Sequence, residues 1–200
     1  MLKNKINNID LQFDDLFYKR VEQFTALLQQ WGAIHNLSAQ LSTEKIYDNV
    51  VDSIYPLKFL NEFQTLADIG TGAGYPGMIL AIAQPDKKIT LIEPKAKRVA
   101  FLNFVKNTLK LNNLTIIQNR VENMPPKVYD IITSRAVTNT SLLLSLTQNL
   151  SNQDTEYLFY KGTLCDTEIK EAKINNYTIV KYGDFRNYLY IKRKGLFNDI

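Results

Sequence analysis

The sequence has little of the two residue types that most often build catalytic and metal sites. Its 200 residues include one cysteine, Cys165, and one histidine, His35. A single cysteine cannot form a disulfide within the chain or supply the cysteine cluster of a structural zinc site. The apolar runs are far shorter than the roughly 18 residues that span a membrane, and no secretory signal is visible. These absences predict a cytoplasmic protein with no membrane association and no metal.

The composition itself indicates a folded protein. Hydrophobic residues make up 45% of the chain and aromatic residues 11%, which is enough for a sizeable core and excludes wholesale disorder. The length fits one domain, or one domain with an appendage. The formal net charge of +4 permits a polyanionic partner without requiring one.

The first part of the chain reads as helical. Apolar residues recur at three- and four-residue spacing over residues 11–31, which predicts an amphipathic helix that stops at Gly32. A second helix is expected to begin after Ser42 and to bend or end at Pro56.

From residue 65 onward, short apolar runs alternate with helical patterns. This alternation predicts βαβ units and a mainly parallel sheet with helices on both faces. The last two runs lie too close together for a crossover helix, so we expect them to form an antiparallel hairpin. The predicted strands are Thr65–Ile69, Lys88–Ile92, Thr115–Gln118, Val128–Thr133, Tyr157–Tyr160, Tyr177–Lys181 and Tyr188–Lys192. Residues 1–60 are expected to be a helical extension packed on a core of residues 61–200, as a single structural unit.

Four of the eight glycines fall between Gly70 and Gly77, where two nucleotide-binding motifs overlap. Gly72, Gly74 and Gly77 spell the G-x-G-x-x-G of dinucleotide-binding folds. Asp68 and the glycines that follow it spell D-x-G-x-G-x-G, which resembles motif I of S-adenosylmethionine-dependent methyltransferases.

The carboxylate of Asp68 favours the second motif. A dinucleotide would present a pyrophosphate to this turn, and Asp68 would repel it. S-adenosylmethionine carries an ammonium and a sulfonium but no phosphate, and glycines let the backbone approach such a ligand closely. A nicotinamide-dependent oxidoreductase, or a turn that binds nothing, remains an alternative at this point.

Two more segments fit a nucleoside cofactor. Glu93 ends the second predicted strand, 25 residues after Asp68, where a carboxylate can accept hydrogen bonds from both ribose hydroxyls. Val121 and Glu122 follow the third predicted strand, where methyltransferases usually hold the adenine ring. An apolar residue beside a polar one suits that role.

Several further motifs carry a family resemblance. They are Asn36-Leu37-Ser38, Val51-Asp52-Ser53-Ile54, Lys97-Arg98 with Phe101-Leu102, Arg120-Val121-Glu122 and Ser134-Arg135-Ala136. With the glycine motif and its Pro76-Gly77 ending, they make the chain from Trp31 to about Lys194 resemble the glucose-inhibited division protein B family. This is the family of small-subunit (16S) ribosomal RNA guanine-N7 methyltransferases.

The resemblance implies a Rossmann-like class I methyltransferase fold with a seven-stranded sheet. It implies S-adenosylmethionine as cofactor and 16S ribosomal RNA or the small ribosomal subunit as partner. We expect the protein to be a monomer, although the sequence itself does not determine the oligomeric state. The residues that the motifs and the resemblance assign to the cofactor are Asp68, Gly70, Gly72, Tyr75, Glu93, Val121, Glu122 and Arg135. Lys161-Gly162 and Arg186 match family positions, of which the first looks like part of the RNA side.

The chain departs from the family pattern at two places. Asp48-Asn49 and Arg186-Asn187 stand where the family usually has Arg-His, which removes positive charge that would contact RNA.

The implied chemistry explains the shortage of catalytic residue types. N7 of guanine has a free lone pair, so it can accept a methyl group without first losing a proton, and the enzyme needs positioning rather than a general base. We therefore expect His35 to be a packing residue and Cys165 to be an unreactive helix thiol. An RNA-binding assembly protein and a small-molecule methyltransferase are alternatives.

Basic residues suggest where RNA would lie. Lys95, Lys97 and Arg98 begin a helix, where acidic residues are usual, so we hypothesise that they face RNA phosphates. Lys192-Arg193-Lys194 is a second candidate patch.

Overall fold

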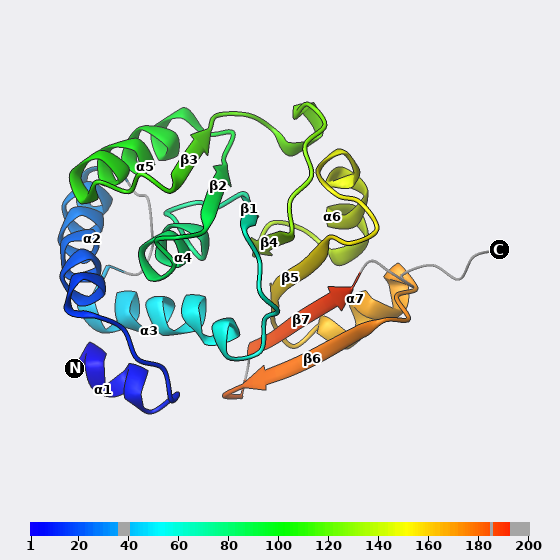
Figure 1. Cartoon of the computed structure of the whole chain (residues 1–200), viewed down its shortest axis with the longest axis horizontal. Coiled ribbons are helices and arrows are strands. Elements are labelled where there is room, and N and C mark those ends of the chain that lie inside the picture. The colour runs from blue at the N-terminus through cyan, green and yellow to red at the C-terminus, as the bar shows by residue number, and fades with distance from the viewer. Residues whose placement is uncertain (36–40, 185, 193–200) are drawn as a thin grey trace.

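A seven-stranded sheet organises the described part of the computed structural model, which comprises residues 1–35, 41–184 and 186–192. Its strands are β1 (Thr65–Ile69), β2 (Lys88–Ile92), β3 (Leu114–Ile117), β4 (Ile131–Arg135), β5 (Glu156–Lys161), β6 (Tyr177–Tyr182) and β7 (Arg186–Lys192). Their order is β3-β2-β1-β4-β5-β7-β6 (Figure 1). β1 to β5 run parallel, while β7 pairs antiparallel with both β5 and β6. The predicted mainly parallel sheet with a C-terminal hairpin is confirmed.

Helices cover both faces of the sheet, because alternate strand residues point to opposite sides. The helices are α1 (Leu2–Asn7), α2 (Asp15–His35), α3 (Thr43–Ile54), α4 (Gly77–Ala83), α5 (Ala96–Leu109), α6 (Thr140–Leu146) and α7 (Cys165–Ala172), with 3-10 turns at Tyr55–Lys58, Val121–Asn123 and Gln148–Leu150. Leu66 belongs to the apolar cluster that includes residues of α1 to α5. Its neighbour Ala67 belongs to the opposite cluster, which includes residues of α6 and α7.

The N-terminal helices share the first of these clusters with the sheet. Phe24 of α2 contacts the rings of Tyr75 and Phe101, with centroids 5.6 and 6.4 Å away. Ser42 caps α3 by accepting a hydrogen bond from the Lys45 amide, and the helix gives way to a 3-10 turn containing Pro56. The predicted start and end of this helix are therefore confirmed.

Three sequence-based expectations were wrong. The prediction included no helix at residues 2–7, where α1 forms. Gly32 does not end α2; it lies inside the helix, and a Cβ there would be 2.4 Å from Leu41 Cδ2, so the glycine permits close packing. The fourth strand begins at Ile131 rather than Val128, because the Lys127 and Tyr129 amides donate to carbonyls of the 3-10 turn Gln148–Leu150 instead of to a strand.

Candidate active site

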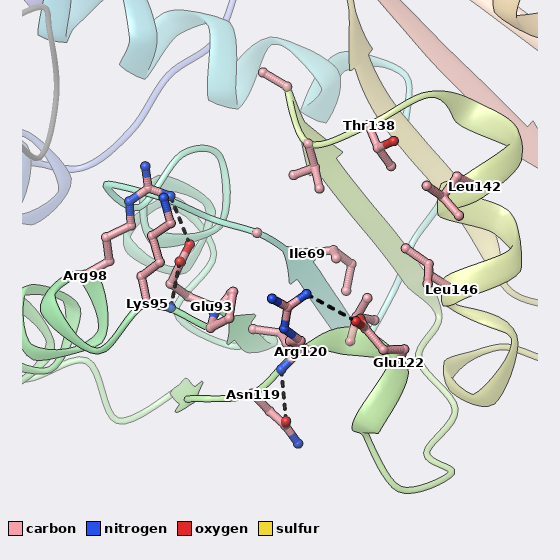
Figure 2. A pocket seen from close by; sticks show the side chains of 16 residues that line it. Ile69, Glu93, Lys95, Arg98, Asn119, Arg120, Glu122, Thr138, Leu142 and Leu146 are labelled. Atoms are coloured by element: carbon pink, nitrogen blue, oxygen red, sulfur yellow. Dashed lines mark hydrogen bonds and ion pairs between the residues drawn. The ribbon is translucent and has the colours of Figure 1, made fainter.

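A pocket of about 360 Å³ lies at the carboxyl ends of the central strands. β1 is paired with β2 on one side and β4 on the other, so the strand order reverses here, which is where open α/β sheets bind ligands. Its walls come from the ends of β1 and β2, the loop after β3, and the segment from β4 into α6 (Figure 2). The volume falls within the range of small-molecule sites.

The glycine loop forms one side of the pocket. Gly70, which lines it, has a φ of +66°, and a Cβ there would lie 2.6 Å from Val137 Cγ2. A side chain would therefore be strained by the backbone conformation and would also collide with the opposite wall.

Glu93 ties the glycine loop to the end of β2. Its side chain is 1% exposed, and its carboxylate accepts hydrogen bonds of 3.0 Å from the amides of Gly72 and Lys95. Arg98 lies 3.5 Å from one of the carboxylate oxygens (Figure 2). A carboxylate has about four acceptor positions, so two backbone donors leave capacity for a ligand with paired hydroxyls.

Asp68 lies buried beneath the same loop. One carboxylate oxygen accepts a 2.9 Å hydrogen bond from the Gly77 amide. Burial raises the pKa of Asp68 to about 7, although the Gly77 hydrogen bond and the charge of Arg135 oppose the shift. The Thr71 side chain also lowers the pKa of Asp68, although its hydroxyl lies outside good hydrogen-bond geometry. The other Asp68 oxygen and the buried Tyr75 hydroxyl have no well-formed hydrogen bond among the described residues. The loop therefore holds unmatched buried polar atoms that a bound cation or donor group would satisfy.

We predict that Asp68 makes stability fall as the pH rises. The folded-state pKa of about 7 lies above the usual 3.8, so between these values the folded chain holds a proton that the unfolded chain has released. Its contribution is fully present below about pH 4 and lost above about pH 7, an effect of roughly 4 kcal/mol. Asp68→Asn removes this dependence. Between pH 5 and pH 8, urea unfolding should therefore show the free energy of unfolding of the parent protein falling relative to that of the variant. Parallel stability curves for the two proteins would contradict the prediction.

Tyr75 and Arg135 do not line the pocket but lie behind the glycine loop. Tyr75 is 5% exposed, packs edge-on against Phe24, and has the Arg135 guanidinium 4.8 Å from its ring centroid. Arg135 donates hydrogen bonds to Asn49 and Asp52 of α3, at 2.8 and 3.0 Å.

The loop after β3 forms a further wall. Val121 is buried and Glu122 exposed, and both line the pocket. Arg120 lies 3.6 Å from Glu122 (Figure 2). The structure thus brings Gly70, Glu93 and these two predicted residues to one cavity. Gly72 is held close to it by its hydrogen bond to Glu93, while Asp68 lies beneath the loop and is bonded to Gly77, outside the lining.

The sequence analysis missed the wall opposite Glu93. The loop before α6 supplies Val137 and Thr138 to it, and α6 itself supplies Leu142 and Leu146. Val137 and Leu142 are 44% and 45% exposed, so they present apolar surface to the opening. The sequence does contain an indication of this wall. Apolar residues in a segment that directly follows a parallel strand can line a pocket as well as belong to the core.

The ion pair between Lys161 and Glu168 lies behind this wall and holds the segment at Thr138 and Thr140 in place. Lys161 at the end of β5 donates to Glu168 at 2.6 Å and to the Thr138 carbonyl at 3.2 Å. Glu168 also accepts from the amide and the hydroxyl of Thr140. Burial alone would raise the pKa of Glu168, but the hydrogen bonds from Lys161 and Thr140 hold it below its usual value.

The remaining candidates lie away from the pocket or beyond the described residues. Cys165 is buried, and burial raises the pKa of its thiol to about 11, which makes it a poor nucleophile. The described residues contain no cluster that would hold a metal ion and no helix long and apolar enough to cross a membrane. The side chain of His35 and residues 193–194 lie outside the described part of the chain.

The donors and charges around the pocket fit S-adenosylmethionine. A buried carboxylate stands at the end of β2 for a ribose, apolar residues line a cavity for a base, and unmatched acceptors beneath the glycine loop suit an ammonium. A pyrophosphate at the glycine loop would instead face the buried carboxyl group of Asp68.

Comparisons with known proteins agree with this chemistry. The family model described as rRNA small subunit methyltransferase G matches residues 18–185. The ribosomal RNA small subunit methyltransferase G of Aliarcobacter butzleri is 57% identical over 96% of this chain and 98% of its own length. That of Wolinella succinogenes is 44% identical over 94% and 96%.

Solved structures show the fold. A SAM-dependent methyltransferase from Aquifex aeolicus superposes with a TM-score of 0.59 at 16% identity, over 76% of this chain and 98% of that one. A ribosomal protein L11 methylase from Lactobacillus delbrueckii gives 0.57 at 11%, over 73% and 79%. The predicted Rossmann-like class I fold is confirmed.

Proposed function

Because the chain belongs to the rRNA small subunit methyltransferase G family, we propose that it transfers a methyl group from S-adenosylmethionine to N7 of a guanine in 16S ribosomal RNA. The observation that carries the proposal is Glu93, a buried carboxylate that joins the glycine loop to a pocket at the reversal point of the sheet. It distinguishes a nucleoside site from an ordinary glycine-rich turn.

The pocket assigns parts of the cofactor to particular residues. Glu93 would hold the ribose, and Val121 and Glu122 would flank the adenine. The backbone of Gly70 and Gly72 would lie against the cofactor. Asp68 would face the ammonium with its unpaired oxygen. Tyr75 and Arg135 would act from behind the loop. When bound, the cofactor supplies a methyl group on a sulfonium, which a neutral nitrogen lone pair accepts directly.

The chain's own residues would act by positioning. The titratable side chains that line the pocket are Glu93, Lys95, Arg98, Arg120 and Glu122, and Glu93 is already engaged with two backbone amides. The other lining carboxylate, Glu122, is exposed and lies 3.6 Å from Arg120, and the reaction proposed here needs neither carboxylate as a base, because the nucleophile needs no deprotonation. Holding N7, methyl and sulfur in line would supply the rate enhancement.

Exposed lysines beside the pocket are candidates for RNA contact. Lys95 and Lys97 are exposed at the start of α5, and neither forms a salt bridge with another described residue. Arg98 differs, because it lies against Glu93 and belongs to the cofactor side.

We predict that Lys97→Glu weakens binding of 16S ribosomal RNA by about tenfold and lowers the salt dependence by about one phosphate contact. The matched control is Lys88→Glu, an equal charge change at an exposed lysine that begins β2, at the opposite end of the strand. Filter binding across a salt series measures both. Equal losses in the two variants would show a general charge effect and contradict a contact at Lys97.

Two alternative functions make different predictions. A nicotinamide-dependent oxidoreductase would bind NADH in calorimetry and would not bind S-adenosylhomocysteine. An assembly protein with an inactive site would incorporate no methyl group into any form of RNA. Asp68 opposes the first alternative, because a pyrophosphate at the glycine loop would meet its carboxylate, and the intact hydrogen bonds between Glu93 and the glycine loop oppose the second.

The deciding experiment maps the product. The protein is incubated with S-adenosylmethionine and either free 16S ribosomal RNA or small subunits from a strain that lacks the enzyme. Chemical cleavage at N7-methylguanine followed by primer extension should then give one new stop. Methyl incorporation without any such stop would overturn the position of methylation, and no incorporation would overturn the activity.

The proposal extends to the organisation of the chain. Residues 1–60 and 61–200 would form a single structural unit, because Phe24 of α2 and α3 pack on the glycine loop and on α4. The proposal also includes action as a monomer in the cytoplasm.

A further inference from the structure

Three side chains from two strands, β4 and β7, donate hydrogen bonds to one carboxylate, that of Asp52. Arg135 at the end of β4 donates to it at 3.0 Å. Arg186 at the start of β7 forms a two-point contact at 2.6 and 2.9 Å. The hydroxyl of Tyr188, also on β7, donates at 3.0 Å.

The charges in this cluster are unequal. Two guanidiniums face one carboxylate, and the side chains of Asp52, Arg135 and Arg186 are only 12%, 17% and 27% exposed. Without the carboxylate, Arg135 and Arg186 would be partly buried like charges with no acidic partner, and they would repel each other. Asp52 therefore supplies the negative charge that keeps Arg135 in its observed place, beside the neutral acceptor Asn49 at 2.8 Å.

The place of Arg135 matters because of what lies beneath it. Its guanidinium stacks 4.8 Å from the ring centroid of Tyr75, which follows the glycines directly. Phe24 contacts the same ring edge-on. Tyr75 thus lies between a cation and an aromatic side chain. The face of an aromatic ring attracts a cation, so the guanidinium is stabilised in its position above the Tyr75 ring.

Other contacts anchor α3 to the sheet independently of this carboxylate. The Tyr160 hydroxyl donates to the Ser53 carbonyl at 2.8 Å, and the Tyr188 hydroxyl lies 3.1 Å from the Asp52 carbonyl. The Tyr160 bond ends on a backbone oxygen, so it survives when the Asp52 side chain changes, and the single Tyr188 proton can then turn from the carboxylate to the Asp52 carbonyl. The carboxylate is therefore free for a role other than fastening the helix.

We propose that Asp52 is a positioning residue that holds Arg135 on Tyr75 and so fixes the glycine loop in the form that binds the cofactor. The assignment rests on the proposed function for the identity of that cofactor. The effect on the loop itself is a property of the ligand-free chain, so it can be measured separately.

The first test is hydrogen exchange on the ligand-free protein. The Gly74 and Tyr75 amides both bond to the Thr71 carbonyl, so their exchange reports on the loop. Asp52→Asn should make them exchange about tenfold faster. The matched control is Asp48→Asn on the same helix, where the lost partner is Lys5 at the surface. Unchanged exchange in Asp52→Asn, or an equal change in the control, would overturn the proposal.

The second test asks whether Asp52 acts through Arg135. Asp52→Asn should weaken S-adenosylhomocysteine binding about tenfold in the parent protein and in an Arg186→Met background. In an Arg135→Met background it should add less than twofold, because the residue that it positions is already gone. Asp52→Glu should restore part of the affinity. An undiminished effect in the Arg135→Met background would overturn the proposal.

Failure of the proposed function would look different. The parent protein would then not bind S-adenosylhomocysteine at all, while faster exchange at Gly74 and Tyr75 in Asp52→Asn would still support the positioning role.

Discussion

Alanine in place of Glu93 is expected to weaken the binding of S-adenosylhomocysteine by about 100-fold. The substitution removes the acceptor of two backbone hydrogen bonds, from Gly72 and Lys95, together with the acceptor that we assign to the ribose. Hydrogen bonds to a charged group contribute about 1.5–3 kcal/mol each, and about 1.4 kcal/mol is a tenfold change in affinity. Isothermal titration calorimetry measures the loss directly.

A conservative variant separates the contribution of the charge of Glu93 from that of its hydrogen-bond acceptors. Glu93→Gln keeps one acceptor oxygen and the shape of the side chain, so we expect a loss of about tenfold. Glu62→Ala is the control, because Glu62 pairs with Lys87 in a different part of the chain and does not line the pocket. If Glu93→Ala bound the ligand as tightly as this control, the ribose assignment would be wrong.

The second large effect concerns stability. A Cβ at Gly77 would lie 2.3 Å from Leu91 Cδ2 and 2.7 Å from the side chain of Asp68. Both neighbours are buried, Asp68 completely, and the Gly77 amide is itself bonded to that carboxylate. Gly77→Ala should therefore destabilise the fold by about 3 kcal/mol or more, since overpacking of a full core displaces backbone.

Urea unfolding with a matched glycine tests this expectation. A Cβ at Gly162 would meet no atom within 4 Å, so Gly162→Ala should change the free energy of unfolding by no more than about 0.5 kcal/mol. Comparable unfolding midpoints for the two variants would mean that the contact between α4 and β1 is looser than the distances indicate.

Local patterns sufficed for most of the secondary structure. β1 and β2 have the predicted bounds, because short apolar runs between turn residues carry a strong signal. Gly32 misled the prediction because a glycine inside a helix can be required by close packing as well as by a helix end, and only the position of Leu41 shows which. α1 was missed because a six-residue helix has too few turns to show a period.

The candidate site divides in the same way. The sequence determined the glycine loop, the acidic residue at the end of β2 and the composition of the loop after β3. Each of these features directly follows one predicted strand, so its position can be read from local motif spacing. The partners of the arginines required the tertiary structure. Arg135 lies 83 residues from Asp52, and Arg186 lies 134 residues from it.

An ion pair of this kind leaves no local pattern. Its energy depends on which strand ends meet and on how much water is excluded, both properties of the assembled sheet and helices. The sequence by itself thus determined the fold class and the chemistry of the pocket. Only the tertiary structure decided that Arg135 turns toward α3, that Tyr75 is buried between Phe24 and Arg135, and that Asp52 is the centre joining them.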